Sequence, residues 1–251
     1  MDQDIQNSTQ TLTKKERQEL RRQEKNNQQE TTQITQNRKR IIKWLITIIS
    51  LSAIVGVMIK IASIPGVEAP VKPLNETDWV RGNKTAPAVL IDYSDFQCPA
   101  CGAYYPILKR LQRELGEEKL LIAYRQFPLT TIHKNAELAA RASEAAGKQN
   151  KFWEMHDLLF DRQAKWENDS TAQNIFVSYA EELKLNKDQF IKDLDSAEVK
   201  NAVNEDVQSG EEAKVDGTPT FFLNGKRIPL TSSYEEFKAL IEQSVNTSST
   251  K

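Results

Sequence analysis

One stretch of the chain is apolar on every face of a helix, and it limits the fold more than any other feature. Residues 41–64 (IIKWLITIISLSAIVGVMIKIASI) form a run of 24 residues with charges only at Lys43 and Lys60. At about 1.5 Å per residue, a helix of this length spans roughly 36 Å, more than the roughly 30 Å hydrocarbon core of a bilayer. We therefore expect a single transmembrane helix. A buried helix of a soluble domain fits poorly, because the residues before it offer nothing apolar to pack against.

The charges around this segment predict its orientation. A basic cluster stands just before the apolar core, in residues 38–43 (RKRIIK), whereas Lys60 stands alone at the far end. By the positive-inside rule the N-terminal tail is cytoplasmic, and residues 65 onward lie outside the cytoplasm. A cleaved signal peptide fits less well, since the core is long and the nearest small-residue site, Val67-Glu68-Ala69, precedes Pro70. We expect an uncleaved anchor in the cell membrane.

The other segments differ in composition. Residues 1–40 are rich in Gln, Asn and Thr and have no aromatic residue, which predicts a disordered cytoplasmic tail. Residues 65–77 hold three prolines among polar residues and predict an extended linker. Residues 78–245 remain as one folded domain, with residues 246–251 as a frayed C-terminus. The 34 Lys and Arg balance 35 Asp and Glu, so the charge gives no reason to expect a nucleic acid partner.

The pattern of the domain predicts an α/β fold. The expected elements are a strand over 88–96, a helix over 98–115, a strand over 119–127, several helices over 133–206, a hairpin of 220–223 with 226–229, and a helix over 234–245. The first strand, helix and second strand form a crossover connection, which favours parallel pairing. Asn224-Gly225 is a typical hairpin turn. We expect a small mixed sheet with a large helical insertion.

The chemistry is concentrated in the only two cysteines, Cys98 and Cys101, at a turn from strand to helix. Cysteines at i and i+3 on a first helical turn are neighbours and can close an easily reduced disulfide. The helix dipole and its free amide groups stabilise a thiolate at Cys98 and lower its pKa, and such a thiolate is a good leaving group. We therefore expect a disulfide that passes readily to the thiols of another protein.

Three other interpretations of the cysteine pair fit less well. A structural disulfide would close too short a loop to add much stability. A zinc site would need two further ligands, but 22 residues lie between His133 and His156, so no metal is expected. Two inert thiols are disfavoured outside the cytoplasm, where oxidation is expected. The chain has no glycine-rich phosphate loop, and we expect no cofactor.

Three segments, read in order, resemble the DsbA-like thiol:disulfide oxidoreductases of the thioredoxin superfamily. They are DYSDFQCPACGAYYP (92–106), YRQFPLTTIHKNAELAARASEAAGKQNKFWEMHDLLF (124–160) and VDGTPTFFLNGKRI (215–228). The resemblance covers about residues 86–245. It implies a thioredoxin fold with a large helical insertion, preceded in this chain by the single transmembrane helix.

The resemblance implies roles for five residues. Cys98 would be the exposed nucleophile that forms a mixed disulfide, and Cys101 the shielded partner that resolves it. Pro219 would be a cis-proline facing them, and Thr218 would offer backbone groups to an extended substrate segment. Relatives place a carboxylate beneath the active site, and we hypothesise that Asp92 shuttles the proton of Cys101. The alternative is a solvated or capping aspartate.

Two further features lie near the active site in the sequence. His133 is expected to cap or orient a helix rather than to catalyse. Between the cysteines stands Pro99-Ala100, without the histidine that the best-known oxidants carry before the second cysteine.

The expected function is donation of the Cys98-Cys101 disulfide to reduced exported proteins, with reoxidation by a membrane-bound redox partner. Two alternatives remain open. A reductase or isomerase of the same fold would run the exchange in the other direction, supplied by a separate reductant. A non-catalytic binding or chaperone-like module would use the disulfide only to lock its fold.

Overall fold

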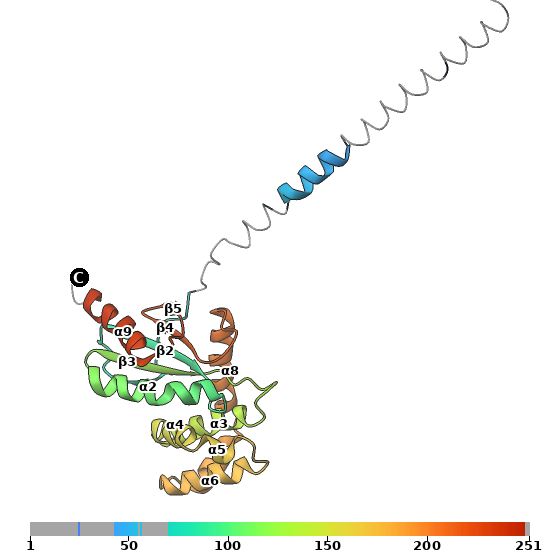
Figure 1. The fold of residues 1–251 in the computed structure, drawn as a ribbon. Helices are drawn as coiled ribbons and strands as arrows, with labels where there is room; N and C mark the ends of the chain where they lie inside the picture. Colours follow the sequence, from blue (N-terminus) through green and yellow to red (C-terminus); the bar gives the residue numbers. More distant parts are fainter. Residues whose placement is uncertain (1–24, 26–42, 55, 57–69, 249–251) are drawn as a thin grey trace, which may run out of the picture. The chain divides into compact units, whose positions relative to one another are not determined.

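A computed structural model describes residues 25, 43–54, 56 and 70–248 of the chain. The chain divides into two units, residues 1–66 and 67–251. The second unit holds a five-stranded sheet with helices around it (Figure 1). Its elements are, in chain order, β1 (Trp79–Arg81), β2 (Ala88–Ser94), α2 (Pro99–Leu115), β3 (Leu120–Gln126), α3 (Ala136–Gly147), α4 (Phe152–Asp161), α5 (Gln163–Trp166), α6 (Ala172–Glu182), α7 (Lys187–Leu194), α8 (Ala197–Glu212), β4 (Thr220–Leu223), β5 (Lys226–Ile228) and α9 (Tyr234–Ser248).

The sheet has the strand order β1-β3-β2-β4-β5. Strands β2 and β3 run parallel, as the crossover predicted, and the other three pairs are antiparallel. The hairpin between β4 and β5 is also confirmed, with positive φ angles of 48° at Asn224 and 83° at Gly225. Strand β2 ends at Ser94, before the predicted residue 96, because the amide of Cys98 donates to the carbonyl of Asp95 and closes a turn. Strand β1 was not predicted.

Alternate residues of the central strands face opposite layers of the domain. Leu90 of β2 and Ile122 of β3 pack in one cluster with residues of α2 and α9. Ile91 and Tyr93 face the other side, where α8 contributes Val207. Because side chains alternate along a strand, Asp92 points to the same side as Leu90, toward α2. The strand pattern therefore places one carboxylate within the core.

The predicted helical insertion is confirmed as a separate layer built from α3 to α7. A third apolar cluster joins these helices to the sheet through Phe96 and Tyr124, with Phe152 and Phe176 buried among the helices. Figure 1 shows α4, α5 and α6 grouped beyond α2, and α4 contacts α2. Helix α8 returns the chain to the sheet, where it packs on β3.

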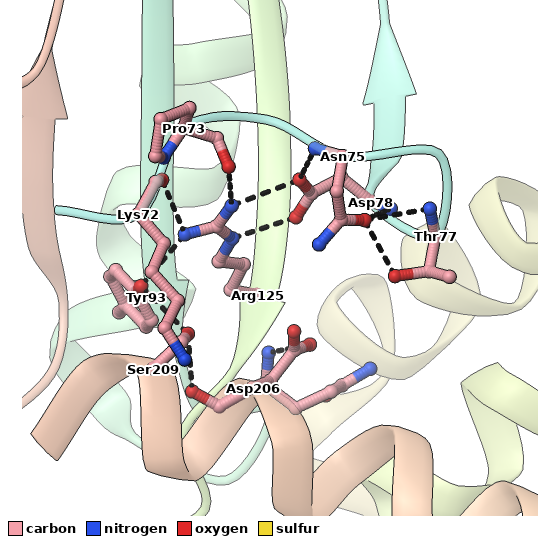
Figure 2. Close-up of polar contacts among 10 residues, drawn as sticks. Lys72, Pro73, Asn75, Thr77, Asp78, Tyr93, Arg125, Asp206 and Ser209 are labelled. Carbon is pink, nitrogen blue, oxygen red and sulfur yellow. Dashed lines mark hydrogen bonds and ion pairs between the residues drawn. The ribbon is translucent and has the colours of Figure 1, made fainter. Parts of the chain in front are cut away.

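A buried arginine holds the segment before β1 on the sheet. The guanidinium of Arg125 donates to both carboxylate oxygens of Asp78, at 2.7 and 2.9 Å. It also donates to the main-chain carbonyls of Lys72 and Pro73, at 3.0 Å each, and to the hydroxyl of Tyr93 at 2.9 Å (Figure 2). A buried cation needs this many acceptors, so the backbone that supplies them is fixed to the domain.

This contact corrects the predicted linker over residues 65–77. Residues 70–77 are irregular in backbone but belong to the folded unit, which therefore begins near residue 70 instead of 78. Residues 65–69 lie outside the described part of the chain. At the other end, α9 continues past the predicted residue 245 to Ser248, and residues 249–251 are again outside.

The predicted transmembrane helix over 41–64 lies only partly within the described residues. Residues 43–54 and 56 are helical, and large apolar side chains there are exposed, from 53% at Leu45 to 71% at Trp44. Among the described residues, no helix has both the length and the apolar character needed to cross a membrane. The tail predicted as disordered, residues 1–40, lies outside the described residues except for Lys25, so its disorder stays a prediction.

Candidate active site

The two cysteines lie on the first turn of α2, at the carboxyl end of β2. Cys98 is the N-cap residue, in extended conformation, and Pro99 follows at a position where a helix requires no amide donor. The amide of Gly102 donates to the carbonyl of Cys98 at 3.1 Å, which starts the helix. In this structure both cysteines are free thiols.

The cis-proline loop covers Cys98. The Thr218–Pro219 peptide bond is cis, as the resemblance implied, and the thiol of Cys98 donates to the carbonyl oxygen of Thr218 at 3.3 Å. Cys98 is 6% exposed and Cys101 2% exposed. The expectation of an exposed Cys98 is therefore wrong for the free protein, although the bond of its thiol to Thr218 is only partly buried.

The two thiols have opposite acidities. The pKa of Cys98 is lowered to about 5, first by a hydrogen bond from the Cys101 thiol, then by Thr218 and by the amides of Cys101 and Ala100, against an opposing effect of burial. The hydroxyl of Thr218 is buried and has no other partner among the described residues, so it is free to bond the thiolate. The helix amides invoked from the sequence contribute, but after these side chains.

Cys101 has the reverse behaviour. Its burial, its hydrogen bond to Cys98 and the nearby charge of Asp92 all raise the pKa of Cys101 well above the ordinary range of a thiol. When only one proton is present on the two sulfurs, it is therefore bound to Cys101. The site separates one thiolate from one persistent thiol.

Asp92 lies inside the domain on the α2 side of the sheet. It is 4% exposed, and its Oδ1 has no hydrogen-bond partner within the described part of the chain. Burial, followed by the charge of Cys98, raises the pKa of Asp92 to about 8, although Ser94 acts in the opposite direction. This environment contradicts the alternative of a solvated or capping aspartate.

A second aspartate holds the turn that carries Cys98. Asp95 accepts from the amides of Gln97 and Leu129, at 2.7 and 2.9 Å. Its Oδ2 also lies 2.6 Å from Nδ1 of His133. His133 therefore fixes the loop that leads into α3, in agreement with the orienting role expected for it.

The helical insertion also supports the turn, through a residue that no sequence pattern indicates. Nε2 of Gln163 in α5 donates to the carbonyls of Phe96, at 2.7 Å, and Cys98, at 3.0 Å. The side chain of Gln97 bonds back to the carbonyl of Glu167 at 2.6 Å. A glutamine in a polar helical stretch has no sequence signal for such a contact, because its partners lie 65 and 67 residues away.

A groove of about 300 Å³ runs beside the cis-proline loop. Its walls are residues 216–220 and 227–230, and Leu230 at its edge is 51% exposed. Among the described residues, no three His, Cys, Asp or Glu side chains lie together as metal ligands would.

A sequence profile of the family described as Thioredoxin matches residues 74–243. The chain belongs to the thioredoxin family. The thioredoxin domain is similar to oxidised BdbD from Bacillus subtilis, with a TM-score of 0.63 and 24% identity over 71% of this chain and 98% of that one. It is also similar to α-DsbA1 from Wolbachia pipientis, with a TM-score of 0.62 and 18% identity over 70% and 94%. These likenesses concern the fold.

Other relatives are longer proteins that are described as Na(+)/H(+) antiporters. The Na(+)/H(+) antiporter NhaA 1 of Salinispora arenicola is 39% identical over 172 residues, which are 68% of this chain and 25% of the antiporter. The NhaA of Herminiimonas arsenicoxydans is 36% identical over 186 residues, 74% of this chain and 28% of the antiporter. The chain thus spans about a quarter of the length of these curated relatives.

Proposed function

We propose that the domain is a thiol:disulfide oxidoreductase that donates a Cys98-Cys101 disulfide to exported proteins. The observation that carries this proposal is the pair of unlike thiols on one helical turn beneath the Thr218 carbonyl, 3.3 Å from Cys98. With its pKa lowered to about 5, Cys98 is a thiolate at neutral pH, so the bond that it donates to the Thr218 carbonyl belongs to its protonated form. A stable thiolate is a good leaving group and stabilises the reduced enzyme, so equilibrium favours passing the disulfide on.

The exchange takes place in two balanced steps. A substrate thiolate attacks Sγ of Cys98, the bond to Cys101 breaks, and its electron pair leaves on Cys101, which takes up a proton. The second substrate thiolate then attacks the substrate sulfur of the mixed disulfide, and Cys98 leaves as a thiolate. Two electrons pass from the substrate thiols to the enzyme, and the substrate keeps the new disulfide.

Asp92 supplies and later receives the proton of Cys101. Its pKa of about 8 means that it carries a proton at neutral pH, which the newly released thiolate of Cys101 can take. Its location within the core, on the same side of the sheet as α2, supports this transfer.

Reduced exported proteins bind in extended form beside the Thr218–Pro219 loop. Once the sulfur of Cys98 joins a substrate, the carbonyl of Thr218 is free to accept a substrate amide, in the manner of strand addition. The exposed Leu230 supports a preference for an apolar residue near the substrate cysteine.

We further infer that residues 41–64 anchor the chain in the cell membrane as one helix, with the N-terminus in the cytoplasm and the catalytic domain outside. The basic residues before the segment and the exposed apolar side chains of residues 43–54 support this inference. A membrane-bound redox partner would then reoxidise the pair by removing two electrons and the one proton that Cys101 carries. Protease treatment of intact cells should digest the domain and spare the N-terminal tail.

The reduction potential of the pair tests the direction of exchange. Equilibration of the full chain with reduced and oxidised glutathione should give a reduction potential of about -120 mV, as expected for a disulfide donor. A reduction potential of about -270 mV would favour the reductase or isomerase. If the wild type exchanges no disulfides and Cys98→Ala still binds clients, the chain is a binding module instead.

A further inference from the structure

A small cavity lies beside Asp92, on the side of the sheet that α2 covers. It measures about 20 Å³, which is room for about one water molecule. Buried residues at its inner end are Asp92, Tyr124 and His156, and partly or fully exposed residues at its outer end are Arg81, Lys109 and Gln112. The cavity therefore leads from the core toward the surface, and no residue of the cis-proline loop lines it.

Two polar atoms face this cavity without a partner. Oδ1 of Asp92 and the hydroxyl of Tyr124 are both buried, and neither has a well-formed hydrogen bond within the described residues, although the Ser94 side chain is near enough to both groups to act on their pKa values. Asp92 in β2 and Tyr124 in β3 are register neighbours in the parallel pair, so their side chains leave the sheet on the same side. Buried polar atoms cost free energy unless they are bonded, and one water in the cavity can bond both.

His156 of α4 is a third polar group at the cavity, buried within a cage of aromatic rings. Six aromatic rings have centroids within 6.2 Å of the centroid of the His156 ring. They belong to Phe96, Tyr105, Tyr124, Phe152, Trp153 and Phe160. Burial lowers the pKa of His156, so the ring is neutral at neutral pH. A neutral imidazole has one donor and one acceptor nitrogen.

The ring is connected to the surface through Asp157. Nδ1 of His156 lies 2.9 Å from Oδ1 of Asp157, which leaves Nε2 as the nitrogen for the cavity. The side chain of Asp157 is partly exposed and lies 3.4 Å from Arg81 and 3.7 Å from Lys109. The pKa of Asp157 is lowered by its bond to His156 and by these cations, although burial acts against them. Asp157 is therefore a carboxylate that can take a proton from Nδ1 and release it to solvent.

We propose that Asp92 exchanges its proton with solvent through this cavity, by way of His156 and Asp157. The proposal rests on the oxidoreductase function proposed above. In the outward direction, Asp92 gives its proton to the cavity water, the water protonates Nε2 of His156, and Nδ1 gives its proton to Asp157. In the inward direction the same transfers run in reverse. Each catalytic cycle protonates Cys101 once and deprotonates it once, so the two directions restore the original tautomer of His156.

A route on this side of the sheet is needed because the other side is covered. Cys98 lies under the Thr218 loop in the free protein, and a bound substrate would cover it further in the mixed disulfide. The charged or titratable groups that face Asp92 and His156 are Cys98, Cys101, Tyr105 and Lys109 from α2 and its N-cap, Tyr124 from β3, Arg81 from β1 and Asp157 from α4.

The experiment separates the two steps by which reduced protein reacts with oxidised glutathione. Attack by Cys98 forms the mixed disulfide and needs no proton loss from Cys101. Attack by Cys101 on the sulfur of Cys98 then expels glutathione and does need it. In His156→Phe and Asp157→Asn, we expect the first step to keep its wild-type rate. We expect the second to slow on the order of tenfold near pH 7, since a group that transfers a proton directly contributes more than this.

Asp161→Asn is the matched control. Asp161 stands one turn later on α4 and also pairs with Lys109, at 3.9 Å, so this variant removes a similar charge and should leave both steps unchanged. Wild-type rates for the second step in His156→Phe and Asp157→Asn, across pH 5 to 9, would overturn the proposed route. If His156→Phe does not fold, the rate of the second step in Asp157→Asn tests the route by itself. A wild type that reacts in neither step would instead refute the oxidoreductase function.

Discussion

The sulfur of Cys98 and the carbonyl oxygen of Thr218 lie 3.3 Å apart, although 120 residues separate them in the chain. The segment between them contains β3, the helical insertion and α8. The insertion therefore returns the cis-proline loop to the cysteine turn, and it also braces that turn directly through Gln163. The acidity of Cys98 depends on the packing of the whole domain.

Replacement of Asp92 by Asn should raise the free energy of unfolding at neutral pH. The pKa of Asp92 rises from 3.8 to about 8 on folding, so between pH 4 and 8 the unfolded chain releases a proton that the folded protein keeps. The wild type thus loses up to about 1.4 kcal/mol per pH unit across this window. Asn has no such titration. Urea unfolding from pH 3.5 to 8.5 should show a gain that grows with pH, whereas a gain independent of pH would contradict the assigned ionisation.

The dithiol form should be more stable than the disulfide form at pH 7. The folded pKa of Cys98, about 5, lies below its ordinary value of 9.0. The thiolate therefore adds stability that is complete above pH 9 and is lost as pH falls through 5. The disulfide form has no such titration, and its short loop adds little stability of its own. Thermal unfolding of both forms should give a difference that shrinks toward pH 5. The opposite sign at pH 7 would argue against disulfide donation.

Gln163→Ala should weaken the active-site turn. The change leaves the carbonyls of Phe96 and Cys98 without their side-chain donor, which costs about 1–3 kcal/mol for a buried group. Disulfide exchange should slow together with this loss. Gln208→Ala is the control, because Gln208 is exposed and bonds Glu212 on its own helix. If the two variants have equal free energies of unfolding and equal exchange rates, Gln163 does not support the active-site turn.

Arg125→Met should release residues 70–77 from the domain. The substitution leaves the buried carboxylate of Asp78 without its cation, and breaking such a pair costs about 3–5 kcal/mol. Limited proteolysis should then cut before β1, and the free energy of unfolding should fall. Arg110→Met removes an exposed ion pair with Glu114 and should change neither result. A protease-resistant Arg125→Met protein would show that other contacts hold the segment.

The cysteine turn and the central strands could be predicted because their signals are local. Spacing places Cys98 and Cys101 on one helical turn, and the turn residues Asn224 and Gly225 define the hairpin. The role of Asp92 was a hypothesis from its position before the cysteines. Its burial now agrees with that hypothesis, while its function stays a prediction.

Contacts between distant segments could not be predicted in this way. The burial of Cys98 depends on the loop at Thr218, and the pairing of Asp92 with Tyr124 depends on strand register. The docking of residues 70–77 depends on Arg125, a charged residue in a mostly apolar, buried strand. The partners in each of these contacts are far apart in the sequence, so no periodic pattern of residues indicates the contacts.

Alkylation of the reduced protein decides whether Cys98 is the ionised nucleophile. Reduced wild-type protein is treated with iodoacetamide from pH 3.5 to 9, quenched with acid, and digested for mass spectrometry. We predict one modified residue, Cys98, with a rate that reaches half its maximum near pH 5, while Cys101 stays unmodified. A Cys98 that resists the reagent, or that reacts only with a midpoint near pH 9, would contradict the proposed enzyme.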